Sequence, residues 1–310
     1  MSGRILITPR SLSKGDHPEL TPLTRAGFEL VCPTPGKMPG EADLIENIAG
    51  CVGWLAGVEA VSPAVIEAAR DLRVISRNGT GVDNLPMPEI EARGIAVQRA
   101  AGANARGVAE LALAFALAGL RDLVPTHMGV AAGHWPRRIG REIHGAEVAV
   151  VGLGAIGVAF AEFCLALGAN VRGYDPFAPD DRLVHPAFRR CDLNAALLDA
   201  EIVSLHVPAQ AEPIIGAGEI ERLAPGVVIV NTAREKLIAP DAMMAALESG
   251  QVAAYATDAF DREPPELTPL LRHPRVMLTS HIGGFTVESV ARATQGAVAG
   301  LLEVLVHHEA

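Results

Sequence analysis

Cysteine is scarce in this sequence, and its arrangement excludes several classes of site. Four cysteines are scattered along the 310 residues, with neither a CxxC pair nor a histidine spacing suited to zinc: Cys32, Cys51, Cys164 and Cys191. Scattered thiols of this kind indicate free or buried cysteines in a reducing compartment rather than a disulfide framework. We therefore expect a cytoplasmic protein without a metal site.

An excess of basic residues is also missing. The chain carries 26 lysines and arginines against 36 aspartates and glutamates, which gives a net charge of −10. This balance argues against nucleic acid or an anionic membrane surface as the main partner. A short basic run, "PRRIGRE" at 136–142, is expected to be a solvated loop.

A hydrophobic run long enough to span a membrane is lacking too. The longest, "GVAELALAFALAGL" at 107–120, is shorter than the roughly 18 apolar residues that a transmembrane helix needs. Its apolar residues lie almost all round the helix, which predicts burial between domains or subunits. The amino terminus, "MSGRILITPR", has the pattern of a short strand, so we expect no secretory signal.

The sequence does contain β-branched runs that alternate with helical patterns, as is typical of α/β proteins with parallel sheets. The predicted strands form two successive series. The first comprises 4–8, 28–32, 51–56, 73–76 and 95–98, and the second comprises 146–152, 170–175, 201–207, 227–231, 253–258 and 275–280. We therefore expect two similar sheets, with a boundary in the small residues near 99–105.

A dinucleotide-binding pattern opens the second series. Gly152, Gly154 and Gly157 form GxGxxG directly after a predicted strand and at the start of a helical pattern. The first glycine allows the tight turn, the second lets the backbone approach a pyrophosphate, and the third allows close packing of helix on strand. The amino terminus of the helix then offers N–H groups to the phosphates. The alternative is that these glycines serve only as turns, and the βαβ context makes that alternative the weaker one.

Asp175 ends the strand after this motif, where a carboxylate can accept hydrogen bonds from the adenosine ribose hydroxyls. Its charge would repel a 2′-phosphate, and Pro176 and Phe177 offer no cation to offset this. The pattern therefore favours NAD over NADP, with Arg172 as the nearby residue that weakens this preference.

Three ionisable groups stand just past later strands of the second series: Arg234, Glu263 and His281. Taken singly, Arg234 could be an ion-pair partner, Glu263 a loop acid and His281 a structural histidine. Their shared position at strand ends favours a catalytic set, because ligands of open parallel sheets bind outside the carboxyl ends of the strands. Arginine offers a planar fork of donors to a carboxylate, and a histidine held by an acid can move a proton near pH 7.

The chain resembles the D-isomer-specific 2-hydroxyacid dehydrogenases, and within that family the phosphoglycerate dehydrogenase branch. The resemblance runs almost end to end, through "SRNGTGVDN", "GANARGVAELALAF", "VGLGAIG", "YDP", "SLHVP", "VNTAR", "TDAFDREP" and "SHIGG". It implies a Rossmann NAD domain at 99–284 inserted into a flavodoxin-like substrate domain at 1–98 and 285–310. Both would be doubly wound α/β domains with parallel sheets, and the protein would be a homodimer.

The resemblance also implies roles for individual residues. Arg234 would bind the carboxylate and carbonyl of a D-2-hydroxy or 2-oxo acid, His281 would be the acid/base, and Glu263 would hold His281. The substrate would be 3-phosphoglycerate or a similar small acid. The implied NAD contacts, the glycine motif and Asp175 included, are Gly152, Gly154, Ala155, Ile156, Gly157, Asp175, Val207, Pro208, Thr232, Ala233, Asp258, Gly283 and Gly284.

The glycine-rich loop "RNGTG" follows a strand of the first series. Its backbone N–H groups could cradle the substrate carboxylate, although a simple tight turn is the alternative. The resemblance favours substrate contact by Gly79, Thr80 and Gly81.

The chain departs from the family pattern at two positions. Glu235 follows Arg234 where glycine is usual, so it would be strained if the position needs a positive φ, or would compete for Arg234 if it points inward. Ala56 stands where phosphoglycerate enzymes carry a phosphate-binding arginine. The chain also stops after the helical pattern that follows residue 286, without the regulatory domain of longer relatives. An NAD(H)-responsive corepressor-like binding protein with damped catalysis is therefore the alternative function.

Overall fold

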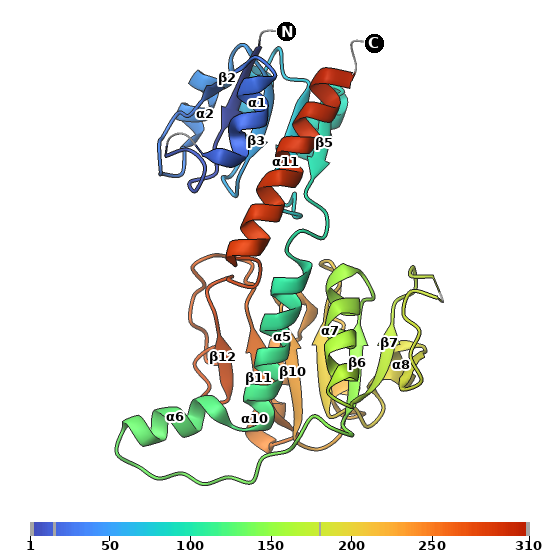
Figure 1. Ribbon diagram of the computed structural model, residues 1–310. Coiled ribbons are helices and arrows are strands. Elements are labelled where there is room, and N and C mark those ends of the chain that lie inside the picture. The colour runs from blue at the N-terminus through green and yellow to red at the C-terminus, as the bar shows by residue number, and fades with distance from the viewer. Residues whose placement is uncertain (1–2, 15–16, 180, 308–310) are drawn as a thin grey trace. The chain divides into compact units, whose positions relative to one another are not determined.

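The computed structural model describes residues 3–14, 17–179 and 181–307, and the chain forms two compact units (Figure 1). Unit 1 comprises Met1–Asn104 and Val287–Ala310, and unit 2 comprises Ala105–Thr286. The division after Asn104 falls within the 99–105 stretch that the sequence indicated, and the two divisions lie a few residues beyond the domain bounds of 98 and 284.

Unit 1 is built on a parallel five-stranded sheet in the order β2-β1-β3-β4-β5. Its strands are β1 (Gly3–Ile7), β2 (Phe28–Val31), β3 (Cys51–Ala56), β4 (Val74–Arg77) and β5 (Ala96–Arg99). Its helices are η1 (Pro18–Leu20), α1 (Thr21–Arg25), α2 (Glu41–Ile48), α3 (Pro63–Ala68), α4 (Met87–Ala92) and α11 (Val287–His307). The strand order reverses between β1 and β3, which is where open α/β sheets place a ligand crevice.

The carboxy-terminal helix α11 packs on the sheet of unit 1, beside β5 in Figure 1. Leu301 and Leu305 are fully or almost fully buried, and a Cβ atom on Gly53 of β3 would lie 3.0 Å from Leu305. By length and composition alone, the stretch Val287–Val306 could cross a membrane, but half of it is buried inside the protein. Its apolar face is therefore accounted for by packing on the sheet.

Unit 2 contains a parallel seven-stranded sheet in the order β12-β11-β10-β9-β6-β7-β8. The strands are β6 (Glu147–Val151), β7 (Asn170–Tyr174), β8 (Phe188–Arg190), β9 (Ile202–Leu205), β10 (Val227–Asn231), β11 (Val252–Thr257) and β12 (Val276–Leu278). The helices are α5 (Ala105–Leu120), α6 (Leu123–Ala131), α7 (Ala155–Ala166), α8 (Leu193–Leu197), α9 (Ala217–Ile220), η2 (Glu235–Leu237) and α10 (Pro240–Ser249). The expected fold class, two α/β units with parallel sheets, is confirmed.

The strand that the sequence reasoning missed is β8. Its residues, Phe188, Arg189 and Arg190, show no apolar pattern, because it pairs only with β7 at the edge of the sheet. By contrast β10 is buried at every position, as its unbroken β-branched run predicts for a strand covered on both faces. Two apolar clusters cover the two faces of this sheet, and α5 lies in one of them through Ala112, Phe115 and Ala116.

The order of the seven-stranded sheet reverses between β6 and β9, which are paired as neighbours. The carboxyl ends of two such strands are where open α/β sheets bind their ligands. The glycine motif directly follows β6, so the fold of unit 2 alone puts that motif at the switch point.

Candidate functional site

The three glycines of the motif occupy three different environments. Gly152 has φ +97°, and a Cβ atom there would lie 2.5 Å from the carbonyl oxygen of His206. A Cβ atom on Gly157 would lie 1.8 Å from the carbonyl oxygen of Gly152, so helix α7 packs as closely on the turn as glycine permits. At Gly154, the N-cap of α7, a Cβ atom would meet open space. This geometry leaves room for a ligand phosphate at the helix amino terminus, where Ala155 and Ile156 begin the helix.

Asp175 lies just after β7 and is held against this loop. Its carboxylate accepts hydrogen bonds from the N–H groups of Leu153 and Phe177, both at 2.8 Å, and of Ala178 at 3.1 Å. Burial by itself would raise the pKa of Asp175, but these three donors and the Arg190 charge outweigh it and lower the pKa below its usual value. The group is therefore a fixed anion beside the glycine turn.

His206 follows β9 and packs beneath the glycine loop, although the sequence reasoning gave its side chain no role. Its Nε2 atom lies 2.9 Å from Oγ of Ser204, and its ring lies against Phe160 with 5.4 Å between centroids. Burial lowers the pKa of His206 to about 3, so the ring is neutral at physiological pH. We read it as a packing residue rather than an acid/base.

Arg234 lies on the turn between β10 and η2, and Asn231 shapes that turn. The Asn231 side chain accepts the N–H groups of Ala233 at 3.1 Å and Arg234 at 3.3 Å, and donates to the Arg234 carbonyl at 2.8 Å. Asn231 is fully buried at the end of an otherwise apolar strand. The sequence reasoning missed it, although a lone amide at the end of such a run was the available signal.

Glu263 and His281 form a pair in unit 2. Oε1 of Glu263 lies 2.6 Å from Nδ1 of His281 and also accepts the Phe260 N–H at 3.4 Å. Because a carboxylate can only accept, the shared proton belongs on Nδ1, which leaves Nε2 of the ring as an acceptor. The side chains are 53% and 42% exposed for His281 and Glu263, so Nε2 is open to a small molecule. The structure thus brings together two of the three predicted catalytic residues.

Asp258 holds the segment that carries His281. Its Oδ1 atom accepts the Thr279 hydroxyl at 2.5 Å and the Ile282 N–H at 2.8 Å, and its Oδ2 atom accepts the Gly283 N–H at 2.7 Å. His281 itself has φ +56°, a left-handed conformation that costs a non-glycine residue about 1–2 kcal/mol. The buried Asp258 carboxylate therefore fixes the chain on both sides of a strained histidine.

Thr232 supplies a further polar atom next to the Arg234 turn. Its Oγ1 atom is buried and has no hydrogen-bond partner in the described part of the chain. Buried hydroxyls are normally satisfied, so this atom fits a site that a ligand completes. The other predicted contacts flank the same strand ends: Val207 and Pro208 follow β9, Ala233 follows β10, and Gly284 follows Gly283.

The predicted substrate loop lies in unit 1, after β4, whereas all the other predicted site residues lie in unit 2. Two of its carbonyl groups are engaged: Gly79 accepts from Ala100 N at 3.1 Å, and Gly81 accepts from Arg77 Nε at 2.8 Å. The N–H groups of Gly79, Thr80 and Gly81 have no acceptor among the described residues. Three free donors in one short loop suit an anion.

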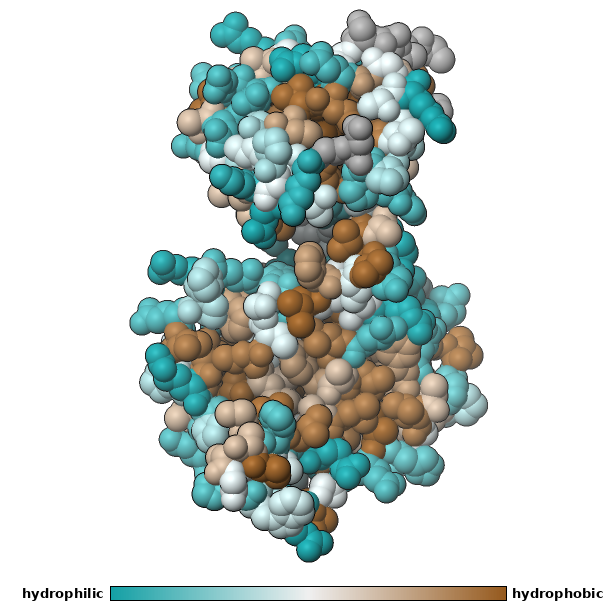
Figure 2. Space-filling view, turned by 60° about the vertical axis from the view of Figure 1, so that its left-hand side comes forward, coloured by the Kyte–Doolittle hydropathy of each residue, from teal (hydrophilic) through white to brown (hydrophobic). Residues whose placement is uncertain are grey.

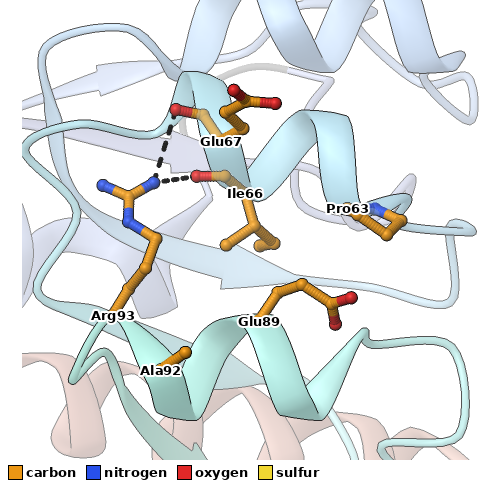
Figure 3. Close-up of a pocket in the computed structure, with 6 residues that line it drawn as sticks. All are labelled: Pro63, Ile66, Glu67, Glu89, Ala92 and Arg93. Atoms are coloured by element: carbon orange, nitrogen blue, oxygen red, sulfur yellow. Dashed lines mark hydrogen bonds between the residues drawn. The ribbon is translucent and has the colours of Figure 1, made fainter.

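A hollow of about 400 Å³ lies elsewhere in unit 1, between α3 and α4 (Figure 3). Arg93 is one of the residues that line it, and its guanidinium donates to the carbonyls of Ile66, Glu67 and Ala69 at the end of α3. That arginine therefore caps a helix and is not free for a ligand. Within residues 3–14, 17–179 and 181–307, no cluster of three or more His, Cys, Asp or Glu could hold a metal ion.

Comparison with known proteins gives consistent results. A family model described as "D-isomer specific 2-hydroxyacid dehydrogenase, NAD binding domain" matches residues 113–283. A D-3-phosphoglycerate dehydrogenase of Archaeoglobus fulgidus is 37% identical over 234 residues, which cover 74% of this chain and 44% of that protein. A hydroxypyruvate reductase of Thermotoga maritima is 34% identical over 239 residues, which cover 75% of this chain and 77% of that protein.

Among solved structures, the TT0316 protein of Thermus thermophilus superposes with a TM-score of 0.84 at 29% identity, covering 97% of this chain and 96% of that one. The chain spans about half the length of the phosphoglycerate dehydrogenases it matches.

Proposed function

The chain belongs to the D-isomer specific 2-hydroxyacid dehydrogenase family, and we propose its function on that basis. On that premise the protein is an NAD-dependent oxidoreductase that interconverts a small D-2-hydroxy acid and the matching 2-oxo acid. The observation that carries this proposal is the Glu263–His281 pair at 2.6 Å, because a protein that only binds a dinucleotide needs no oriented acid/base.

The family match confirms NAD as the class of cofactor, and residues of unit 2 fit it. Gly154 and the first N–H groups of α7 would hold the pyrophosphate, and Asp175 would accept the ribose hydroxyls. The lowered pKa of Asp175 keeps it charged, which disfavours a 2′-phosphate. When bound, NAD accepts or supplies the hydride at the carbon that carries the hydroxyl group.

His281 would move the proton. With Nδ1 directed at Glu263, Nε2 can accept the proton of the substrate hydroxyl in oxidation and return it to the carbonyl oxygen in reduction. Glu263 keeps the ring in this tautomer and offsets the charge of the imidazolium that forms. Asp258 would keep the ring in place by fixing the backbone around it.

Arg234 would bind the substrate carboxylate and polarise the carbonyl. A guanidinium offers two parallel donors to a carboxylate and a positive charge to an oxygen that becomes more negative in the transition state. The turn that carries Arg234 is set by a buried Asn231, so its backbone is already ordered before substrate arrives. Within unit 1, the N–H groups of Gly79, Thr80 and Gly81 would be donors for an anionic substrate group.

The tail of the substrate is where 3-phosphoglycerate and unphosphorylated acids differ. Ala56, at the end of β3, is fully buried, and its carbonyl accepts the Asn78 N–H at 2.9 Å and Nη1 of Arg77 at 3.3 Å. Arg77 is itself buried, and Glu59, only 1% exposed, acts on it electrostatically. We therefore place hydroxypyruvate and glycerate beside the phosphorylated acid as candidate substrates.

We also propose a cytoplasmic homodimer. Helix α6 has no buried residue within the chain, although it carries Leu123, Val124, Met128 and Val130 on its surface. Figure 2 shows hydrophobic residues gathered on one face of unit 2. Exposed apolar patches of this kind commonly mark interaction sites. A second copy of this chain is the simplest partner that would bury this patch. All four cysteines are free thiols, in keeping with a reducing compartment.

The decisive experiment measures absorbance of NADH during incubation with a panel of 2-oxo acids: phosphohydroxypyruvate, hydroxypyruvate, glyoxylate, pyruvate and branched acids. We expect oxidation of NADH with at least one of them and much weaker use of NADPH. Tight NADH binding without turnover of any acid would reject the enzyme and favour the corepressor-like alternative.

A further inference from the structure

Glu235, the residue directly after Arg234, has a backbone conformation that does not require glycine. Among the described residues other than glycine, only Asp122, Asp199 and His281 have positive φ. Glu235 instead opens the short 3₁₀ turn η2. The position therefore does not need a positive φ, and glutamate is not strained there.

The Glu235 carboxylate reaches the loop that follows β11. Its Oε2 atom accepts the backbone N–H of Asp261 at 2.8 Å. The neighbouring Lys236 adds a longer ion pair, with Nζ 3.6 Å from Oδ2 of Asp261. A glycine in place of Glu235 would have no atoms to make the first contact. The turn that carries Arg234 is thus joined to a separate loop by a charge-assisted hydrogen bond.

The loop that Glu235 contacts carries Glu263, two residues beyond Asp261. Residues 261–264 are all exposed, so the loop gains little support from packing. Exposed segments with few buried contacts open most readily, so single anchors have large effects on their position. The 2.6 Å contact between Glu263 and His281 therefore depends on how firmly this loop is held.

We propose that Glu235 is a positioning residue, whose carboxylate fixes the 259–263 loop so that Glu263 is held against His281. This inference rests on the proposed function for its catalytic consequence. It does not place Glu235 on the substrate: the residue acts through Asp261 and Glu263. It also explains why the chain can carry an acid beside Arg234, since that acid has a partner of its own.

The first test compares three variants. Glu235→Ala removes the acceptor, and we expect kcat to fall roughly tenfold while the KM for NADH is unchanged, since small displacements of catalytic groups have effects of this size or larger. Glu235→Gln keeps an oxygen that can accept the Asp261 N–H, so it should recover most of kcat. Lys236→Ala is the matched control, because an exposed ion pair contributes little and no change is expected. Equal losses in the alanine and glutamine variants would overturn the proposal.

The second test is a double-mutant cycle. If Glu235 acts only through Glu263, adding Glu235→Ala to a Glu263→Gln enzyme should change kcat less than about twofold, because the coupled step is already lost. Independent, multiplying effects would contradict the proposal.

The third test does not use activity. Nuclear magnetic resonance should show faster amide hydrogen exchange at Asp261, and shifted ring nitrogen resonances of His281, in Glu235→Ala but not in Glu235→Gln. Unchanged signals in the alanine variant would reject the positioning role even in an active enzyme. Failure of the wild type to use any acid of the panel would reject the proposed function instead. A thermal unfolding midpoint equal to that of the wild type confirms that each variant is folded.

Discussion

Oδ2 of Asp258 accepts the N–H group of Gly283 at 2.7 Å, and a Cβ atom on Gly283 would lie only 2.9 Å from that oxygen. The two residues come from different strand ends, after β11 and after β12, and the contact closes the segment that carries His281. A buried carboxylate is thus used to hold a histidine in a conformation that its own backbone disfavours.

The first prediction concerns Asp258→Asn. The amide would replace one carboxylate acceptor with a donor facing another donor, so it should lower the free energy of unfolding by about 1–3 kcal/mol. Chemical denaturation of the two proteins measures this difference. Asp261→Asn, on an exposed loop, should stay within about 0.5 kcal/mol of the wild type. Equal stability of Asp258→Asn and the wild type would show that the contacts of Asp258 are not needed to hold this segment.

A second prediction concerns the acid/base. His281→Ala should lower kcat by roughly 10²–10⁴, the usual effect of losing a general base, while NADH binding measured by fluorescence titration is unchanged. His134→Ala, in an exposed loop, should behave as the wild type. Turnover by His281→Ala at the rate of the parent enzyme would remove this residue from the mechanism.

Arg234→Lys is the third prediction. Lysine keeps the charge but loses the planar pair of donors, so the KM for the 2-oxo acid should rise and kcat should fall together. Steady-state kinetics with the best substrate of the panel measures both. Arg262→Lys, an exposed arginine of the neighbouring loop, serves as control. A role in binding the carboxylate is excluded if neither constant changes in Arg234→Lys.

The fourth prediction is a pH dependence due to Asp175. Its pKa in the folded protein lies below the ordinary value of 3.8, so ionised Asp175 stabilises the fold above that pH. This contribution is lost as the pH falls through the lowered folded-state pKa, because the group then becomes protonated in both states. The stability difference between the wild type and Asp175→Asn should therefore be constant above pH 5 and shrink below about pH 4. Denaturation curves at several pH values measure it, and a difference that grows on acidification would contradict the lowered pKa.

The fifth prediction concerns the surface of α6. Met128, 62% exposed, should lie in the proposed dimer interface, so Met128→Glu should place a charge in an apolar contact and shift the protein to monomers. Analytical ultracentrifugation of both proteins gives the result. Val58→Glu, at an exposed valine of unit 1, is the matched control and should leave the assembly as it is. A wild type that is monomeric at all accessible concentrations would reject the dimer.

Most of the fold could be predicted, because the spacing of apolar residues along the sequence indicates most of its strands and helices. The β10 run is apolar at every position, and it is buried on both faces. The strand β8 could not be predicted, since it owes its existence to pairing with β7 and its own residues are largely charged. The GxGxxG spacing likewise predicted one turn, one open position and one close contact, and the three glycines occupy those environments.

In the candidate site, too, some features were predictable from the sequence and others were not. The sequence by itself determined the chemical types past the strand ends, an arginine, an acid and a histidine, because each stands a few residues after a predicted strand. Only the tertiary structure decided which groups hold them: Asn231 at the Arg234 turn, Asp258 around His281, and Glu235 on the Glu263 loop. Glu235 and Asp261, for example, are 26 residues apart in the sequence and meet only because β10 and β11 are neighbours in the sheet. Pairing of strands, not local pattern, sets such contacts, and so the residue types were predictable while their partners were not.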